Sequence, residues 1–169
     1  MEFEHVVIVN DPERSPAPPE PLAALIAALR LLAVHPQVFD EDIDDVEVAP
    51  ASGGVLARKI VRGKLVLHER VTLSTGGRAL EQTVEAPDTL AGASRRITIE
   101  EPAPGVLVLR FRYTRKHGTV ESELSEAERG VLRAAYLDKD RDFVARLRDL
   151  SRHGALDTLL SLHAPPGWR

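Results

Sequence analysis

The 169-residue sequence contains no cysteine, which excludes disulfide bonds, thiolate metal sites and cysteine nucleophiles. Aromatic residues are scarce at 4%, so the interior must be built mainly from Leu, Val, Ile and Ala. Such an interior rarely offers stacking surfaces for nucleic-acid bases. The formal net charge is -4, and the composition therefore shows no basic excess that would indicate nucleic acid as a partner.

Long apolar segments are absent as well. The most apolar stretch, residues 22–34, contains Arg30 and is too short to cross a bilayer. The N-terminal residues Met1 to His5 include no basic segment before an apolar run, so no secretory signal is expected. We therefore expect a cytoplasmic protein without stable membrane insertion.

The length of the chain suits one domain with a real core. Hydrophobic residues at 43% and charged residues at 28% give the ordinary balance of a globular protein. We predict one domain over residues 1–153 and a C-terminal tail over residues 154–169, where a short helix and a loose end are both open alternatives. Trp168 in this tail could cover the mouth of a pocket or remain disordered.

Alternating apolar residues predict a strand over Phe3–Asn10, and a helical face follows from Pro21 to His35. Glycine and proline then separate most of six short strand candidates: Val46–Ala49, Val55–Arg62, Leu65–Ser74, Arg78–Glu85, Ser94–Glu100 and Val106–Thr114. Connections this short require antiparallel hairpins, because parallel crossovers need a dozen or more residues.

The period changes to that of a helix from about Ser125, where Ser125 and Glu128 have the spacing of a capping box. Gly154 is a plausible end of this helix. One long helix and one short helix can cover only one face of a sheet. The sequence therefore predicts an α+β fold in which a curved, seven-stranded antiparallel sheet wraps around the long C-terminal helix.

A two-residue turn at Gly63-Lys64 fixes which strand residues face each other. The resulting pairs are Arg62 with Leu65, Ile60 with Leu67, Arg58 with Glu69, and Leu56 with Val71. A turn at Gly76-Gly77 adds the pairs Leu73 with Leu80, Val71 with Gln82, and Glu69 with Val84. Because most of these residues are apolar, this is the covered face of the sheet, and Arg58 and Glu69 lie opposite one another on it.

The same alternation places further polar residues inside. The inward polar set is His5, Arg58, Glu69, Gln82, Arg95, Tyr113, Tyr136 and Asp140. A solid core would not tolerate so many polar groups, whereas a cavity filled by solvent or ligand would. We predict that all of them except His5 bind a ligand, and Glu69 and His5 are the candidates for catalysis.

Simpler interpretations remain open for these residues. Arg58 and Glu69 are compatible with a cross-strand ion pair, and equally with a tuned acid or base, or a polar anchor for a ligand. Outside the sheet, Arg96, Arg110, Arg112 and Lys116 resemble a basic stripe, but Glu81, Glu85 and Glu100 share that surface, so we predict a mixed, solvated face. The six histidines lack metal-ligand spacing, and no cofactor motif is present, so no metal or cofactor is predicted.

The order of these elements resembles the START-like superfamily, also called SRPBCC or birch-pollen-allergen-like, whose fold is the helix grip. More specifically, the chain is similar to the branch of acetylaranotin-cluster-type proteins. The resemblance covers residues 2–153 and is carried by Phe3-Glu4-His5, Val9-Asn10, His35-Pro36, Phe39, Ile97-Thr98-Ile99-Glu100-Glu101-Pro102, Pro104-Gly105, Phe111-Arg112-Tyr113, Ala135-Tyr136 and Asp140.

This resemblance implies a START-like ligand-binding domain for lipids, polyketides, sterols or hormone-like molecules, and some branches of the superfamily are cyclases or hydrolases. The expected function is the binding of a small hydrophobic ligand by a monomer or homodimer. One alternative is a polyketide cyclase or aromatase-like enzyme that uses Glu69 or His5 as a base, with Arg58 or Tyr136 to polarise a carbonyl. The other is a stress-related or regulatory protein gated by its ligand.

Overall fold

The computed structural model describes residues 2–115 and 124–168, so Lys116 of the outer face lies outside the described residues. The elements in chain order are β1 (Glu2–Asn10), α1 (Leu22–Val34), the 3-10 turn η1 (Pro36–Val38), β2 (Asp45–Pro50), the 3-10 turn η2 (Ser52–Gly54), β3 (Val55–Arg62), β4 (Leu65–Leu73), β5 (Ala79–Ala86), β6 (Ser94–Ala103), β7 (Val106–Thr114), α2 (Glu126–Arg152) and α3 (Ala155–His163).

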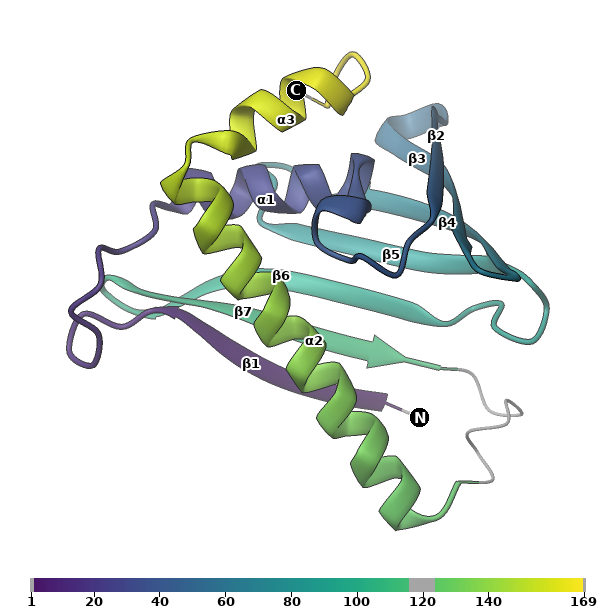
Figure 1. Cartoon of the computed structure of the whole chain (residues 1–169), viewed down its shortest axis with the longest axis horizontal. Helices are drawn as coiled ribbons and strands as arrows, with labels where there is room; N and C mark the ends of the chain where they lie inside the picture. The colour runs from purple at the N-terminus through teal and green to yellow at the C-terminus, as the bar shows by residue number, and fades with distance from the viewer. Residues whose placement is uncertain (1, 116–123, 169) are drawn as a thin grey trace.

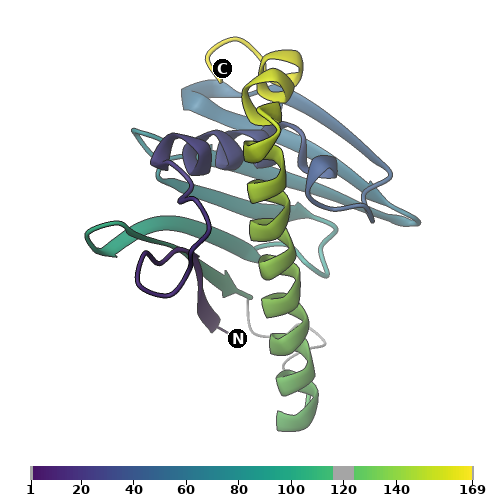
Figure 2. The ribbon, with the colours of Figure 1, turned by 60° about the vertical axis from the view of Figure 1, so that its left-hand side comes forward.

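All seven strands form one antiparallel sheet in the order β1-β7-β6-β5-β4-β3-β2. The long helix α2 crosses one face of this sheet, while α1 and α3 lie together toward one end of that face (Figure 1). Figure 2 shows α2 running across the strands instead of along them. The predicted α+β architecture, a curved sheet around a long C-terminal helix, is confirmed.

The predicted strand register is also confirmed. Both turns produce the expected partners, so Arg58 lies opposite Glu69 and Val71 lies opposite Gln82. Between the pairs His68–Ala86 and Glu69–Val84 the register shifts by one residue. This irregularity lets the sheet bend next to Glu69, because a bulge increases the local twist.

The helix α1 is apolar on nearly all sides because it lies between the sheet and α3. Leu25, Ala28 and Leu29 are completely buried, and α3 and the end of the chain cover the other side of the helix. Trp168 is 9% exposed in this same core and is not among the residues that line the cavity described below, so it neither covers a pocket mouth nor lies in a loose end.

The helix α2 begins with the predicted capping box. The Ser125 hydroxyl accepts a hydrogen bond from the Glu128 amide, and the Glu128 carboxylate accepts one from the Ser125 amide. The buried side chains of α2 all belong to its second half, since the first half extends past the sheet (Figure 1). Gly154, with φ of 63°, supplies the left-handed turn that separates α2 from α3.

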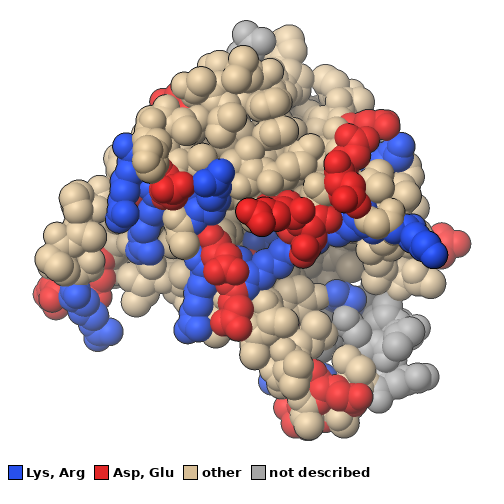
Figure 3. Space-filling view, in the orientation of Figure 1, with Lys and Arg blue, Asp and Glu red and all other residues tan. Residues whose placement is uncertain are grey.

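Charged residues on the outer face of the sheet pair with one another. Arg110 contacts Glu4 and Glu100 at 2.6 and 2.8 Å, and Arg96 lies 3.5 Å from Glu81. The α2 side likewise mixes acidic and basic side chains (Figure 3). The outer face of the sheet is therefore the mixed, solvated surface that was predicted, and its arginines do not form a basic stripe. Among the described residues, no helix is long and apolar enough to cross a membrane.

Candidate ligand-binding site

A cavity of about 350 Å³ lies between α2, the end of α1 and the sheet. Its apolar lining comes from Leu32, Pro36, Phe39, Ile43, Ile60, Leu65, Leu67, Val84, Leu90, Ala93 and Phe143. Its volume lies at the lower end of the range typical of small-molecule pockets, which combine apolar walls with a few polar groups.

Six of the eight predicted inward polar residues line this cavity: Arg58, Glu69, Gln82, Arg95, Tyr113 and Tyr136. They come from six different elements, the five strands β3, β4, β5, β6 and β7 and the helix α2. His5 and Asp140 are not part of the lining and lie behind Tyr113 and Arg95. The structure thus separates the predicted set into a lining group and a supporting group.

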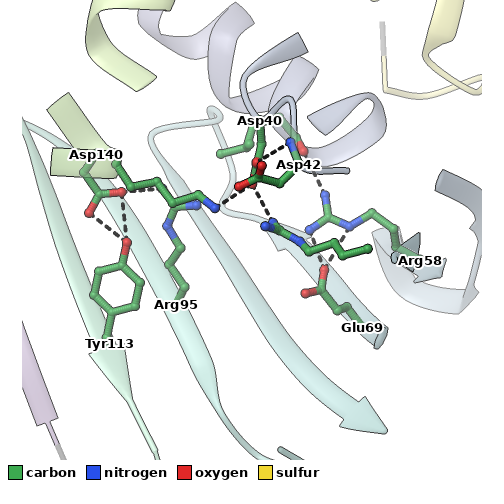
Figure 4. Close-up of polar contacts among 10 residues, drawn as sticks. Asp40, Asp42, Arg58, Glu69, Arg95, Tyr113 and Asp140 are labelled. Atoms are coloured by element: carbon green, nitrogen blue, oxygen red, sulfur yellow. Dashed lines mark hydrogen bonds and ion pairs between the residues drawn. The ribbon is translucent and has the colours of Figure 1, made fainter. Parts of the chain in front are cut away.

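Arg58 connects the sheet to the end of α1. Its Nε and Nη2 donate to Oε2 of Glu69 at 3.0 and 2.5 Å, and its Nη1 donates to the carbonyls of Leu32 and Ala33 at 2.8 and 3.0 Å (Figure 4). These carbonyls belong to the last turn of α1, which has no further amides to bond them. A cation at this position also complements the negative end of the helix dipole. Arg58 is therefore a structural connector as well as part of the lining.

Arg58 is more deeply buried than its partner Glu69. Arg58 is 1% exposed and Glu69 is 11% exposed. Burial lowers the pKa of Arg58, and the carboxylate of Glu69 opposes this shift. Both recorded bonds to Glu69 end on Oε2, so Oε1 accepts no hydrogen bond from a described residue.

Asp140 is the centre of the supporting group. It is completely buried on α2, where it accepts hydrogen bonds from the Tyr113 hydroxyl at 2.7 and 2.9 Å and from Nη2 of Arg95 at 2.7 Å (Figure 4). Burial raises the pKa of Tyr113, so the hydroxyl stays protonated and donates. These bonds anchor the middle of α2 to β6 and β7.

His5 adds a contact from β1. Its Nε2 lies 2.9 Å from Oδ2 of Asp140, but the geometry is not that of a hydrogen bond, and neither ring nitrogen has a hydrogen-bond partner among the described residues. Burial lowers the pKa of His5 below its usual range, while Asp140 acts in the opposite direction. The imidazole is therefore neutral at neutral pH and stacks on Phe111 at 5.4 Å between ring centroids.

A cluster of three charged residues, Asp40, Arg62 and Lys139, lines the outer part of the cavity. Oδ2 of Asp40, in the segment before β2, lies 2.5 Å from Nη2 of Arg62 and 2.7 Å from Nζ of Lys139 on α2. Burial acts to raise the pKa of Asp40, but Lys139 and Arg62 outweigh it, and the pKa lies below its ordinary value. All three residues line the cavity. The sequence places Arg62 on the covered face opposite Leu65, but none of the three was predicted as a site residue.

Tyr136 lies beside this cluster on α2. Its hydroxyl accepts a short hydrogen bond from Arg115, and its ring stacks on Tyr113 with centroids 4.3 Å apart. Among residues 2–115 and 124–168, no group of three or more His, Cys, Asp or Glu is arranged to hold a metal ion.

Two of three comparisons relate this chain to known proteins. The family model described as AtaL, acetylaranotin biosynthesis cluster protein L, matches residues 9–154. A search of the curated proteins finds no match.

Solved structures of the same fold are distant in sequence. The chain is similar to the di-domain ARO/CYC StfQ from the steffimycin biosynthetic pathway, with a TM-score of 0.58, 12% identity, and coverage of 91% of this chain and 52% of that chain. It is also similar to the Zhui aromatase/cyclase from Streptomyces sp. R1128, with a TM-score of 0.54, 14% identity, and coverage of 99% and 98%. A third structure, Ara h 8.0201, has a TM-score of 0.51, 13% identity, and coverage of 88% and 98%. The chain spans about half of StfQ, and identities this low establish the helix-grip fold alone.

Proposed function

This chain belongs to the family of acetylaranotin biosynthesis cluster protein L, and we propose that it binds a small, mainly apolar organic molecule in the cavity under α2. One observation carries this proposal: the concave face of the sheet presents apolar walls and a few polar groups around about 350 Å³ of space. A core that served stability alone would fill this volume, because voids in protein interiors are costly.

Binding is favoured over catalysis by the partners of the polar residues. Arg58 is engaged by Glu69 and by two carbonyls of α1, and the carboxylate of Asp140 is engaged by Tyr113 and Arg95. His5 does not line the cavity, so it is poorly placed to exchange a proton with a bound molecule. Groups occupied in this way orient and support a bound molecule, and none of Arg58, Asp140 and His5 is a free base that faces the cavity.

The test uses the dye 8-anilinonaphthalene-1-sulfonate, whose fluorescence increases in apolar sites. We expect saturable binding of one dye molecule per chain. Val84→Trp should fill the cavity and weaken binding about ten-fold or more, which corresponds to about 1.4 kcal/mol. Val84 lines the cavity, whereas Thr83 is its neighbour on the opposite face of β5, so Thr83→Trp is the matched control and should leave binding unchanged. Equal affinity in wild type and Val84→Trp would contradict the proposal.

A second candidate is an enzyme of the aromatase/cyclase kind. Two observations favour it: two similar solved structures are described as aromatase/cyclases, and Oε1 of Glu69 has no described partner inside the cavity. In this role Glu69 would accept a proton from a polyketide-like substrate. Turnover of polyketide-like substrates by wild type, lost in Glu69→Gln, would support this candidate, and equal turnover in both would remove Glu69 from the mechanism.

A further inference from the structure

The strand register orders the cavity lining from the outside inward. On β3 and β4 the successive inward pairs are Arg62 with Leu65, Ile60 with Leu67, Arg58 with Glu69, and Leu56 with Val71. Leu65 is 39% exposed, whereas Leu56 and Val71 are completely buried and do not line the cavity. The cavity therefore opens near the turn between β3 and β4 and ends at the level of Arg58 and Glu69.

The neighbouring strands repeat this order. Val84 on β5 lies toward the opening, Gln82 follows opposite Arg95 of β6, and Leu80 follows opposite Ile97. Leu80 and Ile97 are completely buried and lie behind the cavity. The cavity thus has a collar of apolar side chains between the ion cluster of Asp40, Arg62 and Lys139 at its mouth and a polar floor at its inner end.

Three groups on this floor lack partners among the described residues. Gln82 is 9% exposed, lines the cavity, and makes no recorded hydrogen bond. Nη1 of Arg95 and Oε1 of Glu69 also make no hydrogen bond with a described residue, and neither atom is closed off from the cavity. Buried polar groups are nearly always hydrogen-bonded in native proteins. These adjacent groups therefore point to a polar group on the bound molecule.

The same groups restrict the chemistry of that polar group. Oε1 of Glu69 needs a donor, whereas the guanidinium of Arg95 needs an acceptor, and a hydroxyl satisfies both requirements. A carboxylate would face the carboxylate of Glu69 with no hydrogen to donate. The floor charges are already balanced, because Arg58 pairs with Glu69 and Arg95 pairs with Asp140. A charged ligand group is therefore not required.

We infer that the ligand is an uncharged, hydroxyl-bearing amphiphile that enters polar end first, with its hydroxyl at Glu69, Gln82 and Arg95. The collar formed by Ile43, Ile60, Leu65, Leu67, Val84 and Leu90 surrounds its apolar part and leaves the tail directed toward the opening. Phenols and alcohols with an apolar substituent belong to this class. The inference rests on the proposed function, since it assigns a ligand class and an orientation to the same cavity.

The experiment compares 4-hexylphenol with hexylbenzene as competitors of 8-anilinonaphthalene-1-sulfonate. Hexylbenzene is the more apolar molecule, so a cavity with an apolar inner end would bind it more tightly. We expect wild type to bind 4-hexylphenol about ten-fold more tightly than hexylbenzene, and 4-hexylanisole, which can accept a hydrogen bond but cannot donate one to Glu69, to bind less tightly than 4-hexylphenol. The anisole comparison needs no variant.

Variants locate the effect. Gln82→Leu should bring the preference for 4-hexylphenol close to one, and urea unfolding should show that this variant is folded. Thr83→Val, on the opposite face of β5, is the matched control and should keep the wild-type preference.

Tighter binding of hexylbenzene than of 4-hexylphenol in wild type would overturn the inference. An unchanged preference in a folded Gln82→Leu would do the same. If the dye binds but none of the three competitors displaces it, the ligand class is wrong while the proposed function survives. If the dye itself shows no saturable binding, both fail together.

Discussion

Replacing Arg58 by methionine removes the side chain that connects α1 to the sheet. Methionine retains much of the apolar stem, so the substitution removes hydrogen bonds and charge more than packing. Glu69 would remain only 11% exposed without its partner, and the carbonyls of Leu32 and Ala33 would lose their donor. Removing one partner of a buried ion pair costs about 3–5 kcal/mol. We therefore expect the free energy of unfolding to fall by about 4 kcal/mol.

Urea unfolding followed by the fluorescence of Trp168 measures this loss, because Trp168 is the only tryptophan and is buried in the core next to α1. Arg96→Met is the matched control: its side chain is 55% exposed and 3.5 Å from Glu81, so the loss should stay below about 1 kcal/mol. The double variant Arg58→Met with Glu69→Leu should be less destabilised than Arg58→Met alone, because no unpaired buried charge remains. A loss in Arg58→Met no larger than that in Arg96→Met would refute the structural role of Arg58.

Two further predictions concern other parts of the fold. The pKa of Asp40 is lowered in the folded state, so its contribution to stability is complete at neutral pH and is lost as the pH falls through about 4 and below. The difference between urea midpoints at pH 7 and pH 3 should thus be smaller in Asp40→Asn than in wild type, and an equal difference would contradict this assignment. Gly77→Ala should lower the melting temperature more than Gly76→Ala, by a difference equivalent to about 1 kcal/mol or more. Both glycines have positive φ, but only a Cβ at Gly77 would approach Cγ2 of Ile26, at 2.9 Å. Equal melting temperatures in Gly77→Ala and Gly76→Ala would contradict this prediction, because they would show that Ile26 and α1 accommodate the added Cβ without loss of stability.

The sheet could be predicted from the sequence because two local rules fix it. Glycine-containing turns at the two hairpins, Gly63-Lys64 and Gly76-Gly77, set the register, and the alternation of side chains then determines which residues share a face. For this reason Arg58 opposite Glu69, on the covered face, follows from the position of one turn. The capping box at Ser125 and the stop at Gly154 are equally local, so both ends of α2 were predictable.

The ion cluster at the cavity mouth could not be predicted in this way. Asp40 lies in an irregular segment, Arg62 is the last residue of a strand, and Lys139 belongs to a helix far along the chain. No period or turn relates these three positions, and their contact depends on how α2 crosses the sheet. The only available signal was that Lys139 is three residues after Tyr136 and so shares its side of α2.

The hydrogen-bond partners of each polar side chain could not be predicted from the sequence either. These partners divide the inward polar residues into two kinds. Both Arg58 and Gln82 were predicted inside on the same grounds, but Arg58 donates hydrogen bonds to Glu69 and to carbonyls of α1, whereas Gln82 makes no hydrogen bond with a described residue. Loss of the first should therefore weaken the fold, and loss of the second should change which molecules bind, with little effect on stability. The inward position of a side chain cannot by itself distinguish these outcomes, because Arg58 and Gln82 both point inward. We infer that ligand selection depends on the polar groups whose bonds the protein leaves unmade, and that the neighbouring ion pairs keep those groups in place.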